Sequence, residues 1–308
     1  MKFRKLVRYR EGEEMKKRLP IVLILVFCLM FTLVACGGGS TGSSNTSSTG
    51  ASGSSDSQGS GVISSPADFP GHTIAVQTET TAALSIDEMQ ENGVEGITAR
   101  RYEKVTQCFD DLALDRVDAV YVDSVVSAYY TAGSDRYKRV WINDEGEPMG
   151  ICLAKESTAL AAAVEAAIDT MFYDGSMADI AAKNFGEDFT AGLRNITEEP
   201  VIPTDYTTIK EGVLLIGSEI GYPPMEYLSD DGSEFIGFDI DFGYRLGELL
   251  GLEVEFINTA WDGIFAGLGK GQYDIIASSV SITPDRQANY ILTEPYVSNA
   301  LSIVVKND

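Results

Sequence analysis

Histidine and closely spaced cysteines are nearly absent from this chain of 308 residues. His72 is the single histidine, and none of the four cysteines has the spacing of a metal-ligand set. No pairing of a nucleophile with a general base is evident either. The sequence therefore predicts no metal, no cofactor and no catalytic residues.

Basic residues are also scarce. The chain has 23 Lys and Arg against 46 Asp and Glu, a formal net charge of −23. Nucleic-acid phosphates are met by clustered cations, so this balance argues against a nucleic-acid partner. Hydrophobic residues make up 44% of the chain and charged residues 22%, as in ordinary globular proteins. The length is sufficient for two domains with substantial cores.

The longest apolar run, Leu19 to Ala35, follows a short basic stretch at 16–18. A basic stretch before an apolar run that ends in small residues is typical of a signal peptide. The run ends in Leu-Val-Ala-Cys, with the cysteine at Cys36. This resembles the bacterial lipobox, whose cysteine is acylated after cleavage. We expect residues 1–35 to be a lipoprotein signal peptide and Cys36 to anchor an extracytoplasmic protein to the cell membrane.

Residues 36–65 consist mainly of Gly, Ser, Thr, Ala and Asn, so they are predicted to form a flexible tether. Cleavage before Cys36 removes eight basic and three acidic residues and leaves 15 against 43, a net charge of about −28. Such a surface is not attracted to anionic lipid, so the membrane anchor has to be covalent. Cys108 and Cys152 fit either a disulfide or two buried thiols.

From Pro66 onward, short apolar strands alternate with amphipathic helices. We expect strands at 73–77, 119–122, 150–154, 213–217, 253–257, 274–278 and 301–305, and helices at 80–90, 102–114, 123–130, 157–173, 176–185, 238–250 and 264–269. Residues 194–211 lack periodicity and contain two prolines, which indicates a linker. The alternation predicts an α/β fold with mainly parallel sheets, in which ligands bind at strand ends beside helix N-termini.

The clearest candidate for ligand binding follows the strand expected at 274–278. Hydroxyls at Ser279 and Ser281 follow that strand, and a helix then opens at Thr283. Such hydroxyls, free backbone amides and the planar guanidinium of Arg286 can together hold a carboxylate. A plain helix cap with Arg286 on the surface explains the segment equally well.

Five motifs in this part of the chain occur together, in this order, in one known family. They are Gly-Tyr-Pro-Pro-Met-Glu-Tyr at 221–227, Gly-Phe-Asp-Ile-Asp at 237–241, Trp-Asp-Gly at 261–263, Ser-Ile-Thr-Pro-Asp-Arg at 281–286 and Glu-Pro-Tyr at 294–296. Together they resemble lobe 1 of the polar amino acid binding proteins of ABC importers, bacterial extracellular solute-binding protein family 3. The segments 68–77 and 116–124 and the pair Thr80-Thr81 resemble lobe 2 of the same family.

The resemblance implies a two-lobed, type II periplasmic-binding-protein-like fold. It implies a protein that captures a free, polar amino acid and delivers it to the permease subunits of an ABC importer. Arg286 would pair with the α-carboxylate of that amino acid, and Asp123 would accept from its α-ammonium group. The other residues placed around the ligand are Thr80, Thr81, Tyr222, Trp261, Ser278, Ser279 and Ser281. Without the resemblance, Asp123 is better explained as a helix cap, and the two aromatic residues equally well as core residues.

Two glutamates are possible specificity residues. Glu79 stands where the family usually has glycine. Facing the cleft, it would favour a cationic or hydrogen-bonding ligand side chain, whereas facing solvent it would have no effect. Glu226 is expected to face solvent. Two other functions remain possible on this fold. In a prephenate- or arogenate-type dehydratase, either glutamate could serve as the general acid that the enzyme needs. A sensory binding protein is the other alternative.

The lobes come in an unusual order. Lobe 2 is expected at 66–150, the return and C-terminal helices at 151–193, and lobe 1 at 212–308, after the linker. We interpret this order as a circular permutation, with a single continuous crossing between the lobes near 150–154 and looser closure than usual. A remnant of a tandem protein, folding by exchange with a second copy, is the rival explanation.

Overall fold

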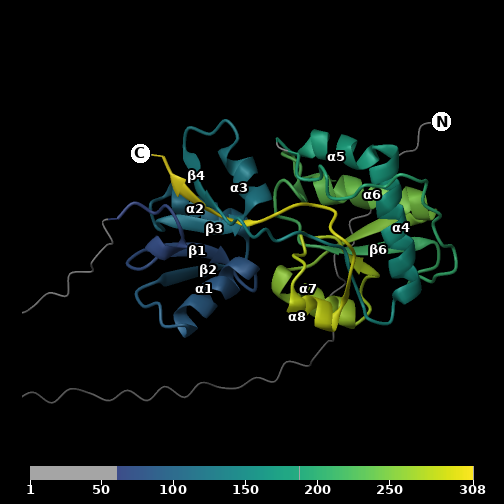
Figure 1. The fold of residues 1–308 in the computed structure, drawn as a ribbon, viewed down its shortest axis with the longest axis horizontal. Helices are drawn as coiled ribbons and strands as arrows, with labels where there is room; N and C mark the ends of the chain where they lie inside the picture. Colours follow the sequence, from purple (N-terminus) through teal and green to yellow (C-terminus); the bar gives the residue numbers. More distant parts are fainter. Residues whose placement is uncertain (1–60, 187, 308) are drawn as a thin grey trace, which may run out of the picture. The chain divides into compact units, whose positions relative to one another are not determined.

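Two five-stranded sheets organise the described part of the chain, residues 61–186 and 188–307 of the computed structural model (Figure 1). The first sheet contains, in spatial order, β2 (Thr98–Tyr102), β1 (Thr73–Gln77), β3 (Ala119–Asp123), β12 (Leu301–Lys306) and β4 (Tyr137–Ile142). Strands β1, β2 and β3 are parallel, and β12 runs antiparallel to β3 and β4. This sheet and its helices, residues 61–147 and 301–307, are lobe 2.

The helices of lobe 2 pack against this sheet. They are α1 (Thr81–Glu91), α2 (Val105–Ala113) and α3 (Ser124–Thr131), and the short 3-10 helix η1 (Pro66–Asp68) precedes β1. The side chain of Thr80 accepts a hydrogen bond from the backbone N–H of Ala83 and so begins α1. The helix predicted from Tyr102 begins only at Val105, because the preceding residues form β2. Neither β2 nor β4 was predicted from the sequence.

The second sheet defines lobe 1, residues 151–292. In spatial order it contains β11 (Ile291–Leu292), β5 (Cys152–Leu153), β10 (Ile275–Ile276), β6 (Val213–Ser218) and β9 (Glu253–Asn258), and a separate hairpin joins β7 (Tyr227–Leu228) to β8 (Phe235–Ile236). Strands β10, β6 and β9 are parallel, whereas β5 runs antiparallel to β10 and β11.

The helices of lobe 1 are α4 (Thr158–Asp174), α5 (Ser176–Asn184), α6 (Phe238–Leu250), α7 (Trp261–Gly269) and α8 (Pro284–Asn289). Helices α4 and α5 pack on α6, and α7 packs on β6 and β10. Gly175 after α4 and Gly251 after α6 have φ of 84° and 70°, a backbone conformation that favours glycine and ends each helix.

Strand β12 follows lobe 1 in the chain but lies in the sheet of lobe 2 (Figure 1). The expectation that 212–308 belongs entirely to lobe 1 therefore fails for the last strand, whose apolar residues complete the other core. The chain crosses between the lobes twice, at 148–150 and at 293–300. Met149 joins the crossings, because its N–H donates to the carbonyl of Val297 (2.9 Å) and its carbonyl accepts from the N–H of Tyr296 (3.0 Å). The expectation of a single continuous crossing is wrong.

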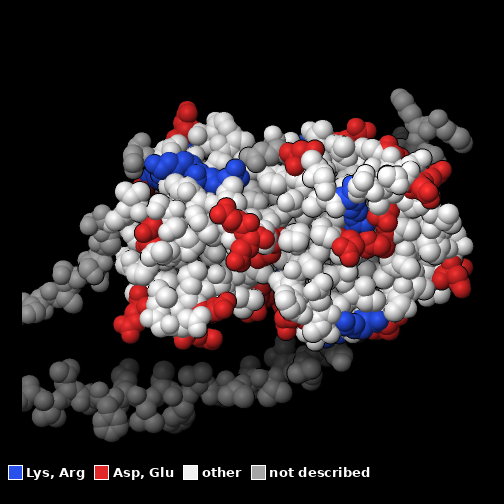
Figure 2. Space-filling model, viewed as in Figure 1, with Lys and Arg blue, Asp and Glu red and all other residues white. Residues whose placement is uncertain are grey.

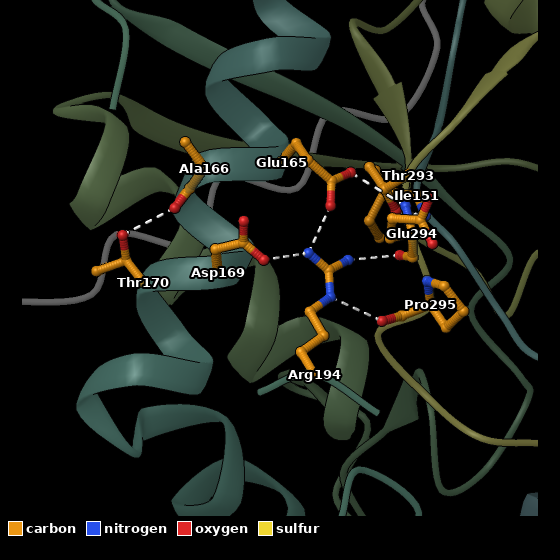
Figure 3. A network of polar contacts seen from close by, with 9 residues as sticks. All are labelled: Ile151, Glu165, Ala166, Asp169, Thr170, Arg194, Thr293, Glu294 and Pro295. Atoms are coloured by element: carbon orange, nitrogen blue, oxygen red, sulfur yellow. Dashed lines mark hydrogen bonds and ion pairs between the residues drawn. The ribbon is translucent and has the colours of Figure 1, made fainter. Parts of the chain in front are cut away.

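Arg194 fixes the chain segment that follows α5 (Figure 3). Its guanidinium side chain is only 6% exposed and donates to Glu165 (2.5 Å) and Asp169 (2.7 Å), both on α4. It also donates to the backbone carbonyls of Glu294 (2.6 Å) and Pro295 (3.0 Å), in the second crossing. One buried cation thus holds the start of the linker, a helix of lobe 1 and one crossing together.

The rest of the linker is irregular, as predicted, but it is fastened to lobe 1. The hydroxyl of Tyr206 donates to the carbonyl of Leu250 (2.7 Å), and the N–H of Ile209 donates to the carboxylate of Asp274 (2.7 Å). These contacts hold the linker against the end of α6 and the loop before β10.

The signal peptide, Cys36 and most of the tether lie outside the described residues. Ile63 is buried among Phe69 and Ile74, so the ordered fold begins before the expected tether end at 65. Cys108 and Cys152 are both buried free thiols, which excludes the disulfide. Within residues 61–186 and 188–307, no helix is both long and apolar enough to cross a bilayer.

Candidate functional site

A small cavity is lined by residues of both lobes. Strand ends and helix starts supply its walls, as expected for an α/β fold. The lining residues are Thr80, Thr81 and Asp123 of lobe 2 and Glu219, Tyr222, Glu226, Trp261, Ser278, Ser279, Ser281 and Arg286 of lobe 1. The structure thus brings together all nine residues that the resemblance places around a ligand, and it adds the two glutamates of lobe 1.

Asp123 ends β3 and stands at the N-cap position of α3, but its side chain makes no capping bond. One carboxylate oxygen accepts from the hydroxyl of Tyr222 (2.5 Å), and the other from the side-chain amide of Asn299 (2.7 Å). The explanation of Asp123 as a helix cap is therefore wrong. Burial, and then the negative charge of Glu147, raise the pKa of Asp123 to about 7.

Arg286 is the cation of the cavity. It lies in α8, which begins where the Thr283 hydroxyl accepts from the Arg286 N–H. The guanidinium donates to the carbonyl of Ser281 (2.9 Å) and lies over the rings of Trp261 (5.4 Å) and Phe265 (5.2 Å). Burial lowers its pKa, but a guanidinium remains charged. Among the described residues, no carboxylate lies within ion-pair distance of this cation.

Two glutamates give the lobe 1 wall an acidic character. Glu226 is fully buried rather than exposed, which contradicts the expectation that it faces solvent. It accepts from the hydroxyl of Ser278 (2.5 Å), while its second oxygen has no partner among the described residues. Burial and the neighbouring Asp239 raise the pKa of Glu226 well above its usual range. Glu219 is 3% exposed, accepts from Gln77 of lobe 2 (2.7 Å) and has its pKa raised to about 7 by burial.

Asp239 supports the cavity from behind. Its carboxylate accepts from the hydroxyl of Tyr296 (2.7 Å) and from the N–H of Ser279 (3.0 Å), and burial raises its pKa to about 6. The bond from its N–H helps to hold Ser279 at a φ of 52°, which serine rarely adopts. The hydroxyl of Ser279 is buried and has no partner among the described residues, so it is available to a bound molecule.

The aromatic residues of the cavity also connect the lobes. Besides the bond from Tyr222 to Asp123, the indole N–H of Trp261 donates to the carbonyl of Glu79 (3.1 Å). Their explanation as plain core residues is incomplete, because both reach across to the other lobe. Glu79 has an exposed side chain and a φ of 61°, and it does not line the cavity. Glu79 contributes only its backbone carbonyl, which accepts from Trp261. Of the two alternatives for its side chain, the structure shows the one in which it faces solvent.

The threonine pair lies at the start of α1. Thr80 caps the helix and donates to the carbonyl of Gln77 (2.7 Å). Thr81 donates to the carboxylate of Glu147 (2.7 Å), which lies just before the first crossing. Sequence reasoning missed Glu147 and Glu219 as neighbours of the cavity. The position of Glu219 directly after the buried strand β6 is the one signal that points to it.

Comparison with known proteins finds matches in about the last third of the chain. Residues 214–308 match the model of the bacterial extracellular solute-binding proteins, family 3. The L-cystine-binding protein TcyA of Bacillus subtilis (strain 168) is 35% identical over 99 residues, which are 32% of this chain and 37% of that protein. A probable amino-acid ABC transporter-binding protein of Haemophilus influenzae is 37% identical over 98 residues, 32% of this chain and 38% of that protein.

An enzyme is also among the relatives. A cyclohexadienyl dehydratase of Pseudomonas aeruginosa is 30% identical over 89 residues, 29% of this chain and 33% of that protein. Among solved structures, an ancestral cationic amino acid solute-binding protein is 40% identical over 25% of this chain and 33% of its own, with a TM-score of 0.24.

The match spans less than two fifths of the length of these curated relatives. It includes all five motifs quoted for lobe 1 and the strand β12. The architecture described above is the two-lobed α/β fold that the resemblance implies. The resemblance found in the sequence is confirmed for lobe 1 and β12: residues 214–308 match the model of the bacterial extracellular solute-binding proteins, family 3.

Proposed function

We propose that this protein captures a free amino acid between its two lobes. The observation that carries the proposal is a pair of opposite charges, on different lobes, that line one cavity: Arg286 on lobe 1 and Asp123 on lobe 2. A planar guanidinium suits the α-carboxylate, and a buried carboxylate suits the α-ammonium group. An amino acid held by both would bridge the lobes and favour their closed arrangement.

The remaining carboxyl groups favour a side chain that donates hydrogen bonds or carries positive charge. When Asp123 accepts from the α-ammonium, Glu219 and Glu226 remain on the lobe 1 wall without a cation of their own within ion-pair distance among the described residues. The pKa of Glu226 is raised well above its usual range, so this side chain keeps its proton and Glu219 carries the negative charge of this wall. A buried carboxylate is costly unless it is paired, so a cationic or amide side chain offsets the burial of Glu219, whereas an acidic one adds a second negative charge beside it. Acidic groups are also spread over both halves of the face seen in Figure 2. Such a distribution of negative charge attracts cations from solution.

Delivery to an ABC importer is the role we propose for this binding. A relative is described as a probable amino-acid ABC transporter-binding protein, and the match covers about a third of each chain. We propose that Cys36 carries the lipid anchor and that permease subunits receive the amino acid. A sensory protein would use the same cavity, and a permease gene adjacent to the gene for this chain would separate the two roles.

Binding without turnover is part of the proposal. A dehydratase on this fold would use a protonated carboxyl group such as Glu226 as its general acid. Burial and the negative charge of the neighbouring Asp239 favour the protonated form of Glu226, although the hydrogen bond from Ser278 opposes it. Incubation of the chain with prephenate or arogenate tests this directly. We expect unchanged substrate, and formation of product would replace the binding proposal with a catalytic one.

Calorimetric titration of the purified full-length chain tests the proposed ligand class. We expect saturable one-to-one binding of at least one of L-arginine, L-lysine, L-histidine, L-glutamine and L-cystine, and none of L-glutamate. Arg286→Ala and Asp123→Asn should each weaken binding at least about tenfold, the value of a hydrogen bond to a charged group. Lys270→Ala, which removes an exposed cation outside the cavity, should not. A folded chain that binds none of these amino acids contradicts the proposal.

We further propose that the lobes are circularly permuted within one chain. The pairing of β12 with β3 and β4 supports this, because it completes lobe 2 from the two ends of the described chain. Residues 194–211 would then join the termini that the family usually has. Light scattering should give the mass of a monomer that binds one amino acid. A dimer that binds two would favour exchange between copies and hence the tandem remnant.

A further inference from the structure

Asn299 lies in the second crossing, is 4% exposed and touches the proposed ammonium-binding carboxylate. Its side-chain nitrogen donates to Asp123 (2.7 Å), and its side-chain oxygen accepts from both the N–H and the hydroxyl of Ser124 (3.0 Å each). An amide is easily placed the wrong way round, but here the network decides the orientation. The oxygen must face the N–H of Ser124, so the nitrogen must face Asp123.

The backbone around Asn299 ties this contact to the hinge. Its carbonyl accepts from the N–H of Glu147 (2.6 Å), just before the first crossing. The next residue, Ala300, exchanges bonds with Ser124: the carbonyl accepts from the Ser124 N–H (2.8 Å), and the N–H donates to the Ser124 hydroxyl (3.1 Å). Asn299 is therefore held to the end of β3, on the lobe 2 side of the hinge.

The two donors to Asp123 differ in what they move with. Tyr222 belongs to lobe 1, so it leaves Asp123 when the lobes separate, whereas Asn299 remains. Burial and the negative Glu147 oppose the ionised form of Asp123, and the positive Arg286 favours it together with these donors. Asn299 is the donor to Asp123 that is bonded to lobe 2 itself.

We propose that Asn299 is a positioning residue, which fixes one oxygen of Asp123 so that the other faces the cavity, and which keeps that carboxylate ionised for a ligand ammonium group. This rests on the proposed function only in taking Asp123 as the ammonium partner. The ionisation of Asp123 can be followed with no amino acid present, so the role of Asn299 can be tested separately.

The first experiment is an NMR titration of the full-length chain labelled with ¹³C at the aspartate carboxyl carbons. The signal that disappears in Asp123→Asn identifies Asp123. In Asn299→Leu we expect the titration midpoint of Asp123 to rise by about one pH unit, because a hydrogen bond to the ionised form is lost. An unchanged midpoint in a folded Asn299→Leu chain overturns the proposal. Should that chain fail to fold, Asn299→Ala removes the same donor without added bulk and is judged by the same criterion.

Ser302→Ala is the matched control for the titration. Ser302 lies in β12, is fully buried and donates to the carbonyl of Val122 in β3 (2.8 Å), but it does not touch Asp123. Its loss weakens the same pair of strands, so it reproduces structural damage without removing the donor. We expect the midpoint of Asp123 to stay where it is in the unsubstituted chain. A shift equal to that in Asn299→Leu would show a general effect of loosened packing and overturn the proposal.

The second experiment is calorimetry with L-arginine between pH 6 and pH 9. Asn299→Leu should bind about tenfold to a hundredfold more weakly at pH 6 and recover part of the loss at pH 9, where Asp123 ionises without help. Equal affinity of both chains at every pH overturns the positioning role. If L-arginine does not bind the unsubstituted chain, that failure concerns the proposed cationic ligand, while the NMR titration still decides the role of Asn299.

Discussion

Asp123→Asn is expected to change ligand binding and folding stability in opposite directions. Asparagine has the shape of aspartate and can keep both contacts of this side chain. Its oxygen can accept from Asn299, and its nitrogen can donate to the hydroxyl oxygen of Tyr222, which is able to accept. The substitution therefore removes a buried negative charge and little else. Binding of an ammonium group depends on that charge, whereas the fold bears the cost of burying it.

The magnitude follows from the pKa of Asp123, which burial raises from 3.8 to about 7. When folding raises the pKa of an acid, the folded state is favoured below the unfolded pKa and loses stability as the pH rises through the folded pKa. With about 1.4 kcal/mol per pKa unit, the loss between pH 4 and pH 8 is about 4 kcal/mol at most. Water and side chains relax around a buried charge, so asparagine should gain roughly 1–3 kcal/mol at pH 8 and close to nothing at pH 4.

Thermal unfolding at the two pH values, without an amino acid present, measures this gain. At pH 8 the midpoint temperature should rise by about 2–12 °C, and L-arginine binding should weaken at least about tenfold. Asp110→Asn, an exposed aspartate on α2, is the control and should shift stability by less than about 0.5 kcal/mol. An Asp123→Asn chain that is less stable than the unsubstituted chain at pH 8 would refute the reasoning, because it would show that the carboxylate stabilises the fold.

Three further substitutions test the framework of the site. Arg194→Ala leaves two carboxylates of α4 without their cation (Figure 3). It should lower the free energy of unfolding, measured in denaturant titrations, by about 3 kcal/mol, and an unchanged free energy would show that the network contributes nothing. Gly237→Ala would place a Cβ 2.3 Å from a backbone oxygen, at a φ of 123°, so the free energy of unfolding should fall by about 3 kcal/mol or more. Its control is Gly269→Ala, in open space at the end of α7, which should leave that free energy unchanged or raise it slightly. Glu219→Gln should weaken L-arginine binding about tenfold in calorimetry and spare L-glutamine, and equal losses for both would contradict a charge-based selection.

Strands and helices could be predicted where burial imposes a clear pattern. All five residues of β3 and all six of β6 are buried, and both strands stand out as apolar runs. Strands β2 and β4 could not be found in this way, because they lie at the two edges of the lobe 2 sheet and are only partly buried. A strand such as Thr98–Tyr102, with two arginines in five residues, has the composition of a loop.

Those residues of the candidate site that lie in a short sequence motif could be predicted from the sequence. Arg286 and the serines before it form one local unit, and the structure brings them together with Asp123 and Tyr222. Asn299 escaped notice because its role depends on a partner 176 residues away, and no local pattern indicates such a contact. The same limit explains Glu226, whose neighbours along the chain are typical of a surface turn although its side chain is fully buried.

The two crossings would also allow the proposed permuted order to preserve the proposed site. Glu147, just before the first crossing, contacts Thr81, and Asn299, in the second crossing, contacts Asp123. The hinge and the lobe 2 half of the cavity therefore form one connected piece. The aromatic residues and Arg286 belong to lobe 1 and would move against this piece. Assembly of the cavity then depends on two adjacent, mutually bonded crossings and not on which lobe comes first in the chain. The expectation of looser lobe closure depended on a single continuous crossing. Because the chain has two crossings, that reason for looser closure no longer holds.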